Sequence, residues 1–138
     1  MKTYIGTKTV KAELMTMGEA CERKLLKAGV TPSECENDKA GYLVEYEGGY
    51  QSWSPADVFE AAYKSADTFL DRLRIEHGEV KARLEGLERF LDQGFDEVAK
   101  KVGARQAALL VCQRMSMKGY VDTLEVRIAD IEEHKGSK

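Results

Sequence analysis

The segment from Leu109 to Ile131 carries an apolar stripe with helical spacing, and this stripe most constrains the fold. Its apolar residues recur at steps of three, four or seven: Leu110, Met117, Val121, Leu124, Ile128 and Ile131. Such spacing predicts a long helix with one apolar face, from about Ala104 to Glu133. Gln113, Tyr120 and Arg127 lie seven residues apart along the edge of that face. An amide, a phenol and a guanidinium there either form a solvated flank, or hydrogen-bond, stack on a base and bind a phosphate.

A second helical pattern runs from Ser54 to Leu91. Its apolar residues follow a near-heptad rhythm: Phe59, Ala62, Ala66, Phe69, Leu73, Val80, Leu84, Leu87 and Leu91. A single helix over this segment would extend roughly 55 Å at about 1.5 Å per residue, which a chain of 138 residues is too small to cover. We therefore expect either a break near residues 64–67 or burial of the helix by other subunits.

Helix-capping residues mark the start of this second pattern. Ser54 is expected at the N-cap, Pro55 at N1 and Asp57 at N3. Trp53 and Val58 then occupy the positions of a hydrophobic staple. The only tryptophan is therefore expected to lock a strand to the helix rather than to contact a ligand.

A short connection joins the two helical patterns, and in it Gly94 and Gly103 bracket an expected short helix over 95–102. Two long apolar-striped helices with a short link predict an antiparallel helical hairpin. A lone hairpin buries its apolar residues poorly, so we expect homo-oligomerisation. Thr68 and Phe69 lie where the first helix is expected to meet another subunit.

The first third of the chain is typical of a small β-containing module. The expected strands are 4–5, 9–14, 41–47 and 50–53, the last two joined by a turn at Gly48-Gly49. Thr16 and Glu19 resemble a capping box for a short helix over 18–27, with Gly29 as its stop and a loop over 31–40. The predicted fold class is thus α+β, with a β-module over 1–64, a helical hairpin over 65–134 and a disordered tail over 135–138.

Composition excludes several classes of function. The net charge of −3 argues against binding a nucleic-acid polymer, and no apolar run approaches the length of a membrane span. Cys21, Cys35 and Cys112 lack metal-ligand spacing, and the chain has only two histidines, so neither a metal nor a cofactor is expected. No nucleophile motif or glycine-rich phosphate loop is present, and His77 is expected at a surface or interface. The chain is therefore predicted not to be an enzyme.

Two charged residues interrupt the apolar rhythm of the first helix. The positions at seven-residue steps after Phe69, where apolar residues are expected, are Glu76, Arg83 and Phe90. Glu76 and Arg83 either pair with each other or across subunits, lie off the seam in solvent, or line a polar cavity for an anion, and the spacing leaves these three interpretations open. Arg72, Arg74 and Arg83, together with Arg127, are able to supply the positive lining of a phosphate pocket in an acidic protein.

Both helical segments resemble a known domain. Residues 72–91 (RLRIEHGEVKARLEGLERFL) and 109–128 (LLVCQRMSMKGYVDTLEVRI) are similar to the two helices of a hairpin domain shared by phage anti-CBASS and Thoeris anti-defence proteins. The matching positions are Arg72, Glu76, Val80, Arg83, Leu87 and Phe90, then Leu109, Leu110, Gln113, Met117, Tyr120, Leu124, Arg127 and Ile128. Near the N-terminus, MKTYIGTKTVKAE, GYLVEYEGGYQSWSP and VFEAAY resemble a module common in small phage proteins. Arg83 stands where the hairpin family has lysine, and Gly86 stands where a basic residue is common.

The resembling proteins are sponges for immune second messengers. The resemblance, closest to the Thoeris anti-defence member with an N-terminal β-module, implies that the chain sequesters cyclic nucleotides without degrading them, in the cytoplasm of an infected bacterial host. The implied ligands are cyclic ADP-ribose isomers made by TIR-domain enzymes, and in hexameric members cyclic di- or trinucleotides at separate subunit junctions. Phosphate contacts are then expected from Arg72, Arg83 and Arg127, base stacking from Phe90 or Tyr120, and a contact to a base or ribose edge from Gln113.

Other functions remain open on the residues alone. In a structural or adaptor protein the hairpin would only oligomerise, and Gln113, Tyr120 and Arg127 would bond between subunits. An enzyme that degrades such messengers is a second alternative, and a nucleic-acid binder ranks last because of the charge.

Overall fold

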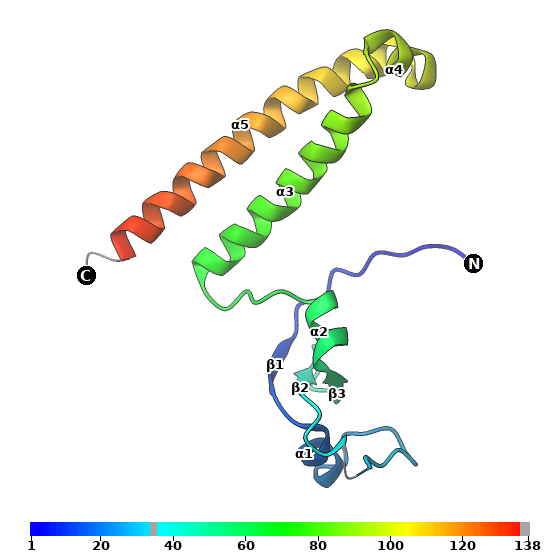
Figure 1. Cartoon of the computed structure of the whole chain (residues 1–138), viewed down its shortest axis with the longest axis vertical. Coiled ribbons are helices and arrows are strands. Elements are labelled where there is room, and N and C mark those ends of the chain that lie inside the picture. The colour runs from blue at the N-terminus through cyan, green and yellow to red at the C-terminus, as the bar shows by residue number, and fades with distance from the viewer. Residues whose placement is uncertain (34–35, 136–138) are drawn as a thin grey trace. The chain divides into compact units, whose positions relative to one another are not determined.

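The computed structural model describes residues 1–33 and 36–135. The chain divides into two compact units, Met1–Lys64 and Ser65–Lys138. The first unit contains β1 (Lys11–Leu14), α1 (Met17–Glu22), β2 (Gly41–Glu45), β3 (Gln51–Pro55) and α2 (Ala56–Ala62). The second contains α3 (Phe69–Leu91), α4 (Phe95–Val102) and α5 (Ala104–Lys135), as Figure 1 shows. The predicted fold class, a small sheet followed by a long helical hairpin, is confirmed.

The sheet of the first unit is antiparallel throughout, with strand order β1-β2-β3. Cross-strand partners share a face of the sheet. On one face Tyr42, which pairs with Leu14, stacks on Phe59 of α2 with ring centroids 4.3 Å apart. On the other face Leu43 packs with Trp53 against residues near α1. The small core of this unit is a cluster of Met15, Ala20 and Leu43, with Leu25, Leu26 and Trp53 packed around it.

Trp53 has a structural role, as expected, but its partners are different. Its indole N–H donates a 2.8 Å hydrogen bond to the carbonyl of Met15, so it ties β3 to the chain that leaves β1. The predicted staple with Val58 is wrong, because α2 begins one residue later than expected. Ser54 lies in β3 and Pro55, not Ser54, is the N-cap residue, with ψ 145°. Val58 is consequently exposed.

Gly41 is the position at which this unit is least able to take a larger side chain. A Cβ there would lie 2.3 Å from the Trp53 ring and 2.5 Å from the backbone carbonyl of Ser54. The carbonyl belongs to the paired strand and cannot move aside without breaking the sheet. Gly41→Ala is therefore expected to destabilise the first unit by about 1–3 kcal/mol. Denaturant unfolding followed by Trp53 fluorescence measures this, with Gly6→Ala, whose Cβ meets nothing within 4 Å, as the control.

Helix α1 is shorter than predicted. The backbone N–H of Glu19 donates to the Thr16 hydroxyl, so Thr16 is confirmed as the N-cap, which is one half of the predicted capping box. The helix then ends at Glu22 rather than near Gly29, because Lys24 adopts a left-handed backbone with φ 59°. The N–H of Leu25 bonds back to the carbonyl of Ala20, which closes a Schellman motif with lysine in the place glycine usually takes. This early end brings Leu25 and Leu26 onto the core cluster.

The strand bounds also differ from the prediction, since β1 and β2 are shorter and β3 is one residue longer. β1 begins at Lys11 rather than Thr9, β2 ends at Glu45 rather than Glu47, and β3 covers 51–55 rather than 50–53. Residues 4–5 form no strand, because no other strand of the described chain lies beside them. The predicted turn is confirmed, since Gly48 and Gly49 have φ of 93° and 90°. Part of the predicted loop (34–35) and of the predicted tail (136–138) lies outside the described residues, and α5 includes residue 135.

The predicted break in the long helical pattern is confirmed between α2 and α3. Thr68 is the N-cap of α3, and it forms a reciprocal capping box with Asp71. The backbone N–H of Thr68 donates to the Asp71 carboxylate, which holds the pKa of that group below its ordinary value. The break thus has a strong local cause, because two otherwise unpaired N–H groups at the start of α3 are satisfied there.

Helices α3 and α5 pack as the long hairpin, with α4 at the connection (Figure 1). The apolar stripes predicted from the sequence form its seam, and its most buried residues are Leu70, Leu73, Leu84, Val121 and Leu124. Val98 of α4 and Ala107 of α5 are fully buried and fix the connection. Gly94 and Gly103, with φ of 97° and 93°, bracket α4 as predicted.

Candidate ligand-binding residues of the hairpin

One flank of the hairpin seam carries the candidate residues. A helix has about 3.6 residues per turn, so Arg72, Glu76, Arg83 and Phe90 fall on the same side of the α3 stripe. The spacing of seven puts Gln113, Tyr120 and Arg127 on one side of the α5 stripe. The Tyr120 hydroxyl donates a hydrogen bond to the Glu76 carboxylate, so these two sides meet. We call this set of seven residues the Tyr120 flank.

The centre of the Tyr120 flank is an electrostatic cluster of three groups. The hydrogen bond to Glu76, with burial and the charge of that carboxylate, raises the pKa of Tyr120 above its ordinary value. The positive charge of Arg127 has the opposite effect and lowers the same pKa. Tyr120 is still 44% exposed, so its ring is accessible from solvent. Glu76 therefore has a neutral partner, the phenol of the other helix, and among the described residues it forms no ion pair with Arg83.

The opposite flank of the seam is closed by ion pairs. Arg74 pairs with Glu132, and His77 Nε2 lies 3.1 Å from a carboxylate oxygen of Glu125. Arg74 therefore does not join the positive lining considered from the sequence. His77 connects α3 to α5 at the surface, as expected. These pairs help to fix the register in which the two helices lie side by side.

Three candidate residues are only loosely engaged within the hairpin. Over residues 1–33 and 36–135, Arg83 and Arg127 make no hydrogen bond or ion pair with other described groups. The Gln113 amide donates a long hydrogen bond to the sulfur of Met117, at 3.7 Å. Long polar side chains of this kind remain available to a ligand.

Arg72 has a role that the sequence did not reveal. Its Nη1 donates to the carbonyls of Ala66 and Asp67, at 3.1 and 3.4 Å. It therefore ties the segment that precedes α3 to the first turn of that helix. Its remaining N–H groups are still able to bind a phosphate.

The candidate residues do not form one pocket. From Arg72 to Phe90 the helix rises roughly 27 Å, at about 1.5 Å per residue. A cyclic nucleotide spans much less than this. Because the helices are antiparallel, the flank divides into an end with Arg72, Tyr120 and Arg127 and an end with Arg83, Phe90 and Gln113.

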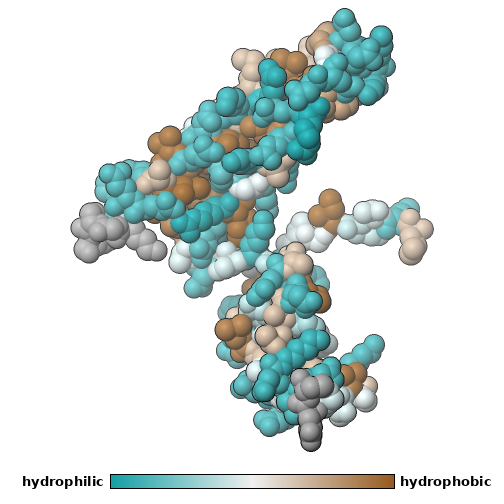
Figure 2. All heavy atoms as spheres, viewed as in Figure 1, coloured by the Kyte–Doolittle hydropathy of each residue, from teal (hydrophilic) through white to brown (hydrophobic). Residues whose placement is uncertain are grey.

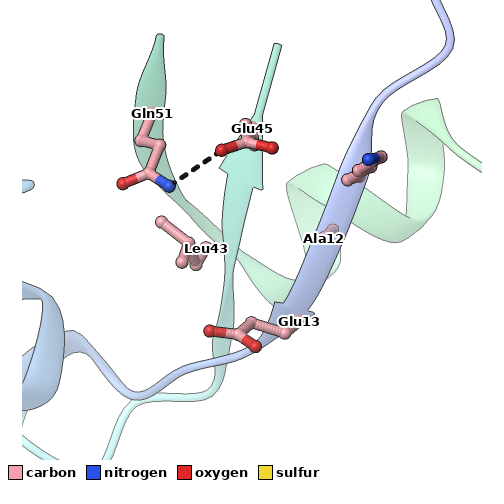
Figure 3. Close-up of a pocket in the computed structure, with 6 residues that line it drawn as sticks. Ala12, Glu13, Leu43, Glu45 and Gln51 are labelled. Carbon is pink, nitrogen blue, oxygen red and sulfur yellow. Dashed lines mark hydrogen bonds between the residues drawn. The ribbon is translucent and has the colours of Figure 1, made fainter. Parts of the chain in front are cut away.

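A separate hollow lies in the first unit, with a volume of about 230 Å³. It is lined by Lys11, Ala12, Glu13, Leu43, Glu45 and Gln51, and none of the six candidate residues borders it. Figure 3 shows the Gln51 amide donating to Glu45 across it, at 3.1 Å. Two carboxylates against one lysine make this hollow unfavourable for an anion.

The structure also bears on metals and membranes. Across the described ranges, no group of three or more histidine, cysteine, aspartate or glutamate residues is placed to hold a metal ion. Cys21 and Cys112 are free thiols. No helix among the described residues combines the length and hydropathy that crossing a membrane requires.

The fold and the flank together define a two-helix domain with an open polar side. Residues 67–130, which hold most of the hairpin, match the family model of the Sequestin domain. No curated protein and no solved structure matches the chain. The family name denotes sequestration rather than catalysis, and the matched range contains all six candidate residues.

Proposed function

We propose that this chain is a phage anti-defence sponge, which binds cyclic nucleotide immune signals and withholds them without degrading them. The observation that carries the proposal is the Sequestin match, because the matched residues 67–130 include both helices of the Tyr120 flank. The proposed ligands are cyclic ADP-ribose isomers made by TIR-domain enzymes, with cyclic di- and trinucleotides as a second class.

The chemistry of the Tyr120 flank suits such ligands. Arg72, Arg83 and Arg127 are proposed to contact phosphates, and Gln113 a base or ribose edge. Phe90 or Tyr120 would stack on a base. Sequestration at a dissociation constant near 10 nM needs about −11 kcal/mol. A few hydrogen bonds to charged groups, at about 1.5–3 kcal/mol each, together with base stacking at about 1–3 kcal/mol, supply a free energy of this size.

Self-association completes the proposed sites. The flank of one hairpin is open, and its candidate residues are too widely spaced for one small ligand. Large apolar side chains of α3 and α5 are exposed as well, among them Phe69, Leu109, Met115 and Val126. Figure 2 shows hydrophobic residues along the face of the hairpin turned to the viewer. We propose that two or more copies, up to a hexamer, cover these residues and enclose ligands at their junctions.

The test is capture followed by release. Purified protein in excess is incubated separately with a cyclic ADP-ribose isomer and with a cyclic dinucleotide, and the filtrate is analysed by chromatography. We expect at least one compound to disappear from the filtrate and to return intact after heat denaturation. A compound that returns cleaved would indicate an enzyme. No loss of any compound from the filtrate would contradict the sponge.

The exposed apolar residues also favour a second candidate function, that of a structural or adaptor protein whose hairpin only oligomerises. Thermal unfolding with each compound separates the two functions. A tight ligand raises the midpoint by mass action, whereas an adaptor without a small-molecule ligand unfolds at the same temperature in every sample.

A further inference from the structure

The N-terminal arm, residues 1–10, has the composition of a strand but no strand partner. Threonine, tyrosine, isoleucine and valine, which favour strands, make up much of MKTYIGTKTV. Among the described residues, none of 1–8 makes a backbone hydrogen bond. Tyr4 is 84% exposed and Ile5 is 90% exposed. In Figure 1 the arm leaves β1 as an extended trace.

The arm continues directly into β1, which is an edge strand. β1 pairs only with β2, so its outer edge presents unpaired backbone groups, and Leu14 at its end is 76% exposed. At the opposite edge of the sheet, β3 ends at Pro55 and α2 follows at once. Proline has no backbone N–H to donate, so further pairing is limited at that end of the edge. The edge that continues into an extended, unpaired segment is that of β1 and the arm.

The arm and β1 are complementary to themselves in an antiparallel pair. If Thr9 lies opposite the same residue of another copy, Tyr4 falls opposite Leu14. These are two of the most exposed apolar residues of the first unit. Leu14 lies on the face of the sheet that Tyr42 and α2 share, and in this register Tyr4 would join it on that face. The same register places Lys11 opposite Thr7 and Lys8 opposite Val10, so no lysine lies opposite another.

We propose that the arm and β1 pair with the arm and β1 of a second copy of this chain. Two sheets then join into one continuous antiparallel sheet around a two-fold axis. The pairing buries Tyr4 and Leu14 of each copy and satisfies the outer backbone groups of β1. It is separate from any contact between hairpins, because it uses only residues 1–14.

The experiment places a photo-crosslinker in the full-length chain, as Tyr4→p-benzoylphenylalanine. After irradiation we expect a covalent product at twice the 15.4 kDa of one chain on a denaturing gel. Tryptic digestion of this product should join the peptide with position 4 to residues 12–23, which contain Leu14. The same substitution at Val30, which is also exposed, is expected to give no such product.

A second variant tests whether strand pairing is the cause. The N–H of Met15 donates to the carbonyl of Gly41 in β2, so odd-numbered residues of β1 face β2 and even-numbered residues face the open edge. Gly6, which falls opposite Ala12, therefore presents its backbone donor to the second copy. Gly6→Pro removes that donor and should abolish the product, whereas Gly6→Ala should preserve it. Absence of the covalent dimer in the parent chain, or attachment of position 4 to a hairpin peptide, would overturn the proposal. Neither outcome bears on ligand capture, so the proposed function is tested independently.

Discussion

Leu124→Ala is expected to lower the free energy of unfolding of the hairpin unit by about 2–5 kcal/mol. Leu124 is only 1% exposed and is among the largest fully buried side chains of the described chain. It lies in the middle of the seam between α3 and α5, where the loss of three carbon atoms leaves a cavity that long, paired helices cannot easily close. Because two helices contribute most of this core, the loss is a large fraction of the unit's stability.

The two units provide separate signals for this measurement. Far-UV circular dichroism reports chiefly on α3 and α5, whereas the only tryptophan, Trp53, lies in the first unit. In urea at a fixed protein concentration, the dichroism midpoint should fall while the fluorescence midpoint stays. Arg114→Ala, at an exposed polar residue of the same helix, is the control and should change neither. Equal shifts in the two variants would show that Leu124 is not a core residue.

The hairpin was predictable because each of its helices is specified by a pattern of apolar residues within its own segment. The stripe through Leu110, Met117 and Leu124 has one period along one helix, and α3 and α5 each need only that period to form. Gly94 and Gly103 likewise mark α4 through backbone conformations that glycine favours. The break before α3 follows from the capping residue Thr68, although the sequence pattern alone left a continuous helix possible.

The contacts across the hairpin were not predictable in the same way. Glu76 was recognised as a charge beside the seam, but its partner Tyr120 depends on the register of two helices far apart in the sequence. The loop contact of Arg72 depends on how the chain approaches α3. The sequence did place Arg83, Gln113 and Arg127 on a common side of their helices. It gave no sign that Arg72 and Phe90 lie too far apart to share a small ligand.

In the first unit, residue propensities predicted some ends of the short helices and strands incorrectly. Lys24 takes a left-handed conformation that glycine usually supplies, so α1 ends before Gly29, the residue predicted to stop it. Ser54 was a plausible N-cap, but pairing with Tyr42 keeps it in β3. For Tyr4 and Ile5 the strand propensity is real and only the partner is missing, which is the basis of the proposed pairing between copies.

Arg127→Glu is expected to weaken binding of the captured cyclic nucleotide at least about 100-fold. A hydrogen bond between charged groups contributes about 1.5–3 kcal/mol, and placing a carboxylate against a phosphate adds repulsion to that loss. A free-energy change of about 2.8 kcal/mol corresponds to about 100-fold in the dissociation constant. Arg127 is exposed and makes no hydrogen bond or ion pair within the part of the chain described here, so the fold should not change.

Lys118→Glu is the matched control for Arg127→Glu. It replaces a positive with a negative charge on the same helix, at an exposed residue that forms a 3.9 Å ion pair with Asp122. Lys118 lies on the side of α5 away from the Tyr120 flank. Isothermal titration calorimetry, with circular dichroism to verify the helix content, should therefore show a large loss only for Arg127→Glu. Equal losses would mean that net charge rather than a specific phosphate contact governs binding, and the assignment of Arg127 to the ligand would then be wrong.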